Sequence, residues 1–154
     1  RVRAMTIRPA LCVLVVSVLG GGCGGGNAAT PEAALQKLLD AARNGDPAAF
    51  REGFPSHEEI AELFECPPGV DLAARFDGLS DEFVAWRDSK PVIAGALKVG
   101  VHSVIETGEE IGGCKARREM SMMRADVHLT EGANDRLYQM RFVELDGRFR
   151  VLGF

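Results

Sequence analysis

The sequence contains no motif for a cofactor, a phosphate loop or a catalytic nucleophile. The patterns G-x-S-x-G and H-E-x-x-H, and the glycine-rich phosphate loop, are all absent. The three histidines, His57, His102 and His128, do not fall at the close spacing typical of zinc ligands. We therefore expect no cofactor and no metal ion, and the motifs name no reaction.

The chain also lacks an excess of positive charge. The chain has 18 Lys and Arg against 22 Asp and Glu, for a formal net charge of −4. Residues 27–89 hold 13 of the acids and 5 of the bases, whereas residues 90–154 are nearly balanced. Because a nucleic-acid-binding domain needs a basic surface, we expect no nucleic-acid partner.

The first 22 residues resemble an export signal in their order of segments. Arg1, Arg3 and Arg8 come before an apolar run at residues 10–19, and small residues follow. This order is typical of a secretory signal peptide. The apolar run is about half the ~20 residues that a membrane-spanning helix needs. We therefore expect residues 1–22 to be a signal peptide and the protein to be exported to the cell envelope.

The end of this leader, Leu19-Gly20-Gly21-Gly22-Cys23, resembles that of a bacterial lipoprotein. In that family a Leu and two small residues come before a cysteine that becomes the lipidated first residue. Here Leu19 stands one position too early, which leaves ordinary signal peptidase cleavage as the alternative. The resemblance implies that Cys23 carries a lipid anchor in a membrane. Residues 23–29 would then be the lipidated cysteine and its glycine-rich tether, facing the periplasm or lying at the cell surface.

Two cysteines, Cys66 and Cys114, remain once Cys12 is removed with the leader and Cys23 is lipidated. In an oxidising compartment such a pair most simply forms a disulfide. Free buried thiols are the alternative.

Residues 30–154 are expected to form a single domain that begins with helices. Thr30 and Asp46 each come before a proline, which is a signal for a helix start. Ser56 and Glu59 have the spacing of a capping box. Helices are expected at residues 31–43, briefly from 47, from 57, and in two turns within 71–89 that break near Gly78.

From residue 92 the apolar residues alternate with a period of two, which indicates strands. Residues 114–129 are expected to form one long strand. Its change of parity predicts a β-bulge near Ser121–Met123 that turns Val127 and its neighbours inward. Asp146-Gly147 predicts a two-residue hairpin. Residues expected to share one face are Leu97, Val99, Val101 and Ile105 on an earlier strand, and Ala125, Val127 and Leu129 on the long one.

This order of elements predicts an α+β fold, with N-terminal helices packed on a curved antiparallel sheet of about four strands. The segments PEAALQKLLDAARNGDPAAF and RLYQMRFVELDGRFRVLGF are similar to the nuclear transport factor 2-like (cystatin-like, SnoaL-like) superfamily. The resemblance implies a cone whose pocket lies between sheet and helices. Enzymes of that superfamily carry acid–base residues in the pocket, and many other members are noncatalytic. No catalytic motif of those enzymes aligns with this chain.

Asp126 and His128 are the candidate catalytic residues. They lie two apart on an expected strand and therefore share a face, where a carboxylate can orient an imidazole for acid–base chemistry. If Val127 and Leu129 face inward, however, this pair faces water. A solvated strand face is the favoured interpretation.

Arginines are scattered over the expected strands, interleaved with acids. We expect cross-strand ion pairs with Glu119 or Glu144, and an anion site is the alternative. The arginines are Arg117, Arg118, Arg124, Arg136, Arg141, Arg148 and Arg150.

Together these patterns predict a cell-envelope lipoprotein with a noncatalytic binding or structural module. The expected partners are the membrane, through Cys23, and either a protein or a small apolar ligand. A small cone-fold enzyme, an isomerase, cyclase or hydrolase of the SnoaL-like kind, is the alternative.

Overall fold

The computed structural model describes residues 28–153. The expected signal peptide at residues 1–22, the lipidation site Cys23 and most of the tether lie outside the described residues. Within residues 28–153, no helix is both long enough and apolar enough to cross a membrane.

The first three helices begin where the sequence predicts. Thr30 caps α1 (Pro31–Arg43) by accepting a hydrogen bond from the Ala33 amide, and Asp46 caps α2 (Pro47–Arg51) in the same way. Ser56 and Glu59 form the predicted capping box at the start of α3 (His57–Leu63). These local signals satisfy amide groups that a helix start leaves without partners.

Helix α3 ends at Leu63, and a short strand, β1 (Phe64–Glu65), follows it directly. Two further helices, α4 (Ala74–Asp77) and α5 (Ser80–Ser89), are separated at Gly78 as expected.

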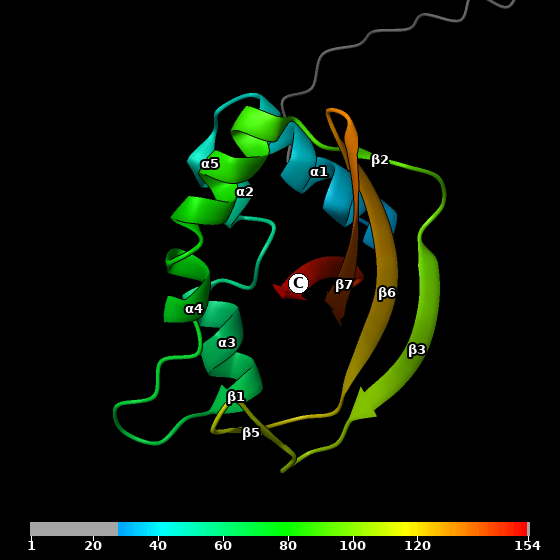
Figure 1. The fold of residues 1–154 in the computed structure, drawn as a ribbon. Helices are drawn as coiled ribbons and strands as arrows, with labels where there is room; N and C mark the ends of the chain where they lie inside the picture. The colour runs from blue at the N-terminus through cyan, green and yellow to red at the C-terminus, as the bar shows by residue number, and fades with distance from the viewer. Residues whose placement is uncertain (1–27, 154) are drawn as a thin grey trace, which may run out of the picture.

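In the described part of the chain the strands form two antiparallel sheets, where the sequence predicted one sheet of about four strands. The main sheet has five strands, and a small sheet of three strands has the order β1-β5-β4. The main sheet follows the path β2-β6-β7-β8, and β3 pairs with β6 beside β2. Figure 1 shows the helices on one side and the main sheet curving around the other. The strand bounds are β2 Val92–Ile93, β3 Lys98–Ile105, β4 Glu110–Ile111, β5 Cys114–Ala116, β6 Met120–Glu131, β7 Asn134–Leu145 and β8 Arg148–Gly153.

The prediction of one strand over residues 114–129 is wrong, because strand β5 of the small sheet ends at Ala116. There the Arg117 amide donates to the carbonyl oxygen of Leu63, at 2.8 Å, and the Arg117 side chain reaches the Phe64 carbonyl. Strand β5 therefore pairs with β1, and the long strand β6 starts afresh at Met120.

The predicted bulge near Ser121–Met123 is also misplaced. Strands β6 and β7 pair without a register shift from Met122 to Glu131, whereas β3 has a shift between Val99 and Val101. The extra residue is Gly100. Glycine suits a bulge because it has no side chain that must be accommodated there. Val99 and Val101 therefore do not share a face as expected, and both are about half exposed, at 48% and 55%.

The core lies between the helices and the inner face of the main sheet. Ala125, Val127 and Leu129 on β6 have no exposed surface, which confirms that they point inward. Phe50 packs edge-to-face on Trp86, and Trp86 packs in the same way on Tyr138 of β7, so aromatic rings connect the two layers. The α+β class with helices on a curled antiparallel sheet is confirmed.

Cys66 and Cys114 form the expected disulfide, with their Cα atoms 4.3 Å apart. The bond joins the segment after β1 to the start of β5, and so links two neighbouring strands of the small sheet covalently.

Replacing both cysteines with serine is expected to lower the free energy of unfolding by about 4 kcal/mol, because the bond closes a loop spanning 48 positions in the unfolded chain. Urea denaturation of the wild type and of the Cys66→Ser/Cys114→Ser double variant measures the difference. Reduced wild type is the control and should unfold like the variant. Equal stability of the oxidised wild type and the variant would contradict the prediction.

Candidate functional site

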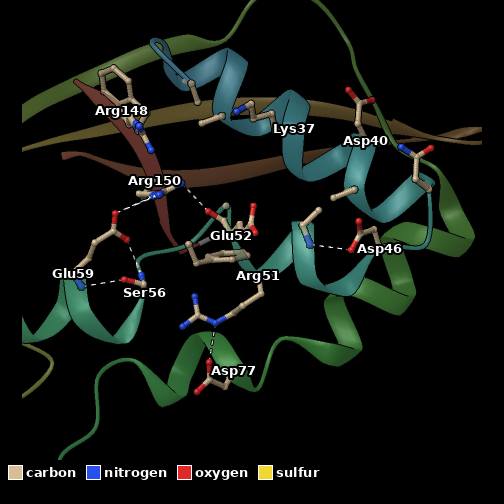
Figure 2. Close-up of a pocket in the computed structure, with 18 of the residues that line it drawn as sticks. Lys37, Asp40, Asp46, Arg51, Glu52, Ser56, Glu59, Asp77, Arg148 and Arg150 are labelled. Atoms are coloured by element: carbon tan, nitrogen blue, oxygen red, sulfur yellow. Dashed lines mark hydrogen bonds and ion pairs between the residues drawn. The ribbon is translucent and has the colours of Figure 1, made fainter. Parts of the chain in front are cut away.

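A cleft of about 820 Å³ lies where α1, α2 and the start of α3 meet the edge strand β8. This volume is within the range of small-molecule sites. Figure 2 shows Arg148 and Arg150 from β8 on one side of the cleft, and Asp40 and Asp46 on the other. Its charged lining consists of Lys37, Asp40, Asp46, Arg51, Glu52, Glu59, Asp77, Arg148 and Arg150, with His57 beside them.

The edge of β8 is held against the helical layer by two backbone hydrogen bonds. The Phe149 amide donates to the Ala28 carbonyl at 2.8 Å, and the Val151 amide donates to the Gly53 carbonyl at 2.9 Å. A side chain at Gly53 would collide with Leu38 of α1, so the close approach of the Gly53 backbone to α1 requires glycine. These contacts set the position of the arginines on β8 relative to α2 and α3.

Arg150 connects β8 to α2 and α3 across the cleft. Its Nη1 donates to the Glu52 carbonyl at 2.8 Å, and its Nη2 lies 3.3 Å from Glu59 Oε1. The other carboxylate oxygen of Glu59 accepts the Ser56 amide in the capping box. The expected partner on a neighbouring strand, Glu119 or Glu144, is therefore wrong for Arg150.

Asp77 accepts hydrogen bonds from two side chains at the same end of the cleft. Arg51 Nε lies 2.7 Å from its Oδ1, and His57 Nε2 lies 2.7 Å from its Oδ2. The hydrogen bond from Arg51, followed by that from His57, lowers the pKa of Asp77 below its ordinary value of 3.8. Both partners are far away in the sequence, so the local pattern indicates only a surface position for His57.

Two cations of the cleft have no acidic partner among the described residues. Lys37 on α1 and the exposed Arg148 on β8 both line the cleft, and neither forms an ion pair or a hydrogen bond with a carboxylate there. An arginine and a lysine that remain available in this way can bind a carboxylate or phosphate group.

Asp126 and His128 lie elsewhere. They belong to β6, where Asp126 is half-buried, His128 is exposed, and both point away from the buried Val127 and Leu129. The structure places them opposite Gln139 and Leu137 of β7, and neither lines the cleft. Within the described part of the chain, no cluster of His, Cys, Asp and Glu suits a metal ion.

Comparison with known proteins assigns the chain to no family. No family model, no curated protein and no solved structure matches it. Its function is therefore inferred from the geometry and chemistry of the cleft.

The substitution Arg51→Gln is expected to raise the pKa of Asp77 toward 3.8, because Arg51 is the largest cause of the lowering. A carboxyl NMR titration measures this. Since the pKa of the folded state is lowered, the Arg51–Asp77 pair stabilises the fold above the ordinary pKa. That contribution disappears as the pH falls through the lowered pKa. The stability difference between wild type and variant should therefore shrink in acid.

The control is Arg87→Gln, since Arg87 pairs with Asp88 and not with Asp77. This variant should leave the titration of Asp77 unchanged. If Arg51→Gln also left it unchanged, the assigned cause of the shift would be wrong.

Proposed function

We propose that the protein is an exported, lipid-anchored module that binds a polar ligand without catalysing a reaction. The ligand occupies the cleft between α1, α2 and β8 and carries an anionic group. The observation that supports this proposal most strongly is that Lys37 and Arg148, in a cleft of about 820 Å³, form no ion pair with any residue that the structure describes.

The chemistry of the cleft favours a charged ligand over the small apolar one expected from the sequence. The cleft lining mixes cations and carboxylates, whereas the concave side of the sheet is filled. Ala125, Val127, Met140 and Phe142 have no exposed surface there, because the helices cover them. A ligand on that side would have to displace packed core, at a cost of several kcal/mol.

We also propose that the domain is nuclear transport factor 2-like. Support comes from the order of elements, with helices before a curved antiparallel sheet and a closing hairpin at Asp146-Gly147. Enzymes with such a cone carry acid–base groups between sheet and helices. Among the described residues here, no polar or charged side chain is buried, which favours a noncatalytic member.

One observation favours an acid–base enzyme as the second candidate function. His57 Nε2 lies 2.7 Å from Asp77 Oδ2, and both line the cleft. A carboxylate can hold an imidazole in the tautomer that a general base needs. Both side chains are about half exposed, however, and Arg51 binds the same carboxylate. Water therefore screens the pair, and we place this function second.

Lipidation is tested by intact-mass analysis of the protein purified from its host membranes. The expected mass is that of a chain beginning at Cys23, increased by acyl chains and reduced by two hydrogens for the Cys66–Cys114 bond. Cys23→Ser should abolish the acyl mass. A mature chain without acyl groups, or one beginning elsewhere, would contradict the anchor.

The ligand class is tested by thermal unfolding with citrate, inorganic phosphate and glutamate as probes. At least one is expected to raise the Tm by roughly several degrees at a saturating concentration, because binding to the folded state stabilises it. Lys37→Gln and Arg148→Gln should each reduce this shift.

Lys115→Gln is the matched control, because Lys115 is exposed on β5 and outside the cleft. Stabilisation by the probes that is the same in all three variants would place anion binding outside the cleft. If the cleft only binds a ligand, His57→Gln should leave the Tm shift intact. In the enzyme alternative, His57 is a functional group of the cleft.

A further inference from the structure

The side of the main sheet that faces away from the helices has an unusual combination of side chains. We call it the outer face. The register of the strands defines its members, because directly paired residues share a face. Tyr138 of β7 packs on Trp86 of α5, so the residues of β7 on either side of it point outward. The outer face comprises Val92, Lys98, Val101, Arg124, Asp126, His128, Leu137, Gln139 and Arg141.

Arg124 and Arg141 lie directly opposite each other on β6 and β7, and both are exposed. Neither forms an ion pair within the described residues. By contrast, Arg136 of β7 pairs with Glu131, and Arg150 of β8 pairs with Glu59. Like charges directly across a strand pair destabilise a sheet. Two guanidinium groups in this arrangement are stabilised when an anion lies between them.

Further positive charge lies close by. Lys98 on β3 is exposed and sits opposite Asp126, which is the one carboxylate beside the arginine pair in this register. The centre of the outer face is therefore cationic, although the chain as a whole has a net charge of −4.

Exposed apolar side chains lie on the same face as these cations. Val101 lies in the same row as the two arginines and is 55% exposed, Leu137 is 57% exposed, and Val92 is 49% exposed. A soluble anion would use only the arginines. A surface that mixes cations with apolar side chains instead suits the headgroup region of a bilayer, where each kind of group finds a partner.

We propose that the outer face docks on a membrane surface that contains anionic phospholipids, with lipid phosphates bound between Arg124 and Arg141. Val92, Val101 and Leu137 then contact the headgroup–acyl boundary. This docking adds a noncovalent hold to the proposed lipid anchor, because cationic side chains near an anionic membrane surface are attracted to it. Because the helices cover the opposite side of the sheet (Figure 1), the cleft between α1, α2 and β8 stays open to solvent.

The docking is tested without the anchor, so that it can fail or succeed independently of lipidation and of the ligand cleft. The chain from residue 23 is prepared with Cys23→Ser and mixed with sedimentable vesicles of phosphatidylglycerol and phosphatidylcholine in equal parts, or of phosphatidylcholine alone. We expect binding to the anionic vesicles only, with strong loss at high salt. Arg124→Gln and Arg141→Gln should each lower the partition coefficient about fivefold, the effect of one charge near such a surface.

Two further variants distinguish docking on a lipid surface from general attraction between opposite charges and from binding of a soluble anion. Arg136→Gln is the matched control, since Arg136 is also exposed on β7 but pairs with Glu131 and lies on the other face. It should bind like the wild type. Leu137→Ser should weaken binding to vesicles and leave the response to inorganic phosphate unchanged.

Three results would overturn the proposal. The first is equal partition onto both kinds of vesicle, and the second is an equal loss of binding in Arg124→Gln, Arg141→Gln and Arg136→Gln. The third is that NMR detects binding of inorganic phosphate at Arg124 and Arg141 while the protein does not partition onto anionic vesicles. That result would assign the arginine pair to a soluble anion.

Discussion

Burial of apolar side chains between the helices and the inner face of β6 and β7 is the interaction on which the rest of the structure depends. The helices within residues 28–153 are short, and the longest of them, α1, has 13 residues. None of them would be stable alone. They persist because Leu35, Leu38 and Leu39 of α1 and the rings of Phe50 and Trp86 are buried in one core with the sheet. The inner face of the sheet is apolar in turn and needs the helices to cover it.

This constraint decides where charge and chemistry can lie. Because the space between the layers is filled with apolar groups, the charged residues lie at the rim and on the outside. At the rim, β8 meets α1 and α2 and leaves a polar cleft. There Arg150 pairs with Glu59 and Arg51 with Asp77, whereas Lys37 and Arg148 have no acidic partner in the described part of the chain. On the outside, Arg124 and Arg141 face each other, and neither forms an ion pair among residues 28–153. The two unneutralised sites lie on different surfaces of the domain.

The proposed roles are compatible with one another. A lipid anchor before residue 28 and a docked outer face would both hold the domain at a membrane, while the cleft remains accessible beside the helical layer. The Cys66–Cys114 disulfide belongs to neither surface. It joins the segment after β1 to β5 in the small sheet β1-β5-β4, whose strands have only two or three residues each.

The sequence by itself determined the local structure. Thr30, Asp46 and the Ser56–Glu59 box begin the helices, and Asp146-Gly147 makes the hairpin, because the groups that satisfy these backbone atoms lie within four residues. The alternation of Ala125, Val127 and Leu129 determined the buried face of β6. Only the tertiary structure decided that Gly100 carries the bulge, that Arg150 binds Glu59 rather than a neighbouring strand, and that Asp77 meets Arg51 and His57. These contacts join residues 20 to 91 positions apart, and their partners are selected by how the layers pack, which no local pattern of residues encodes.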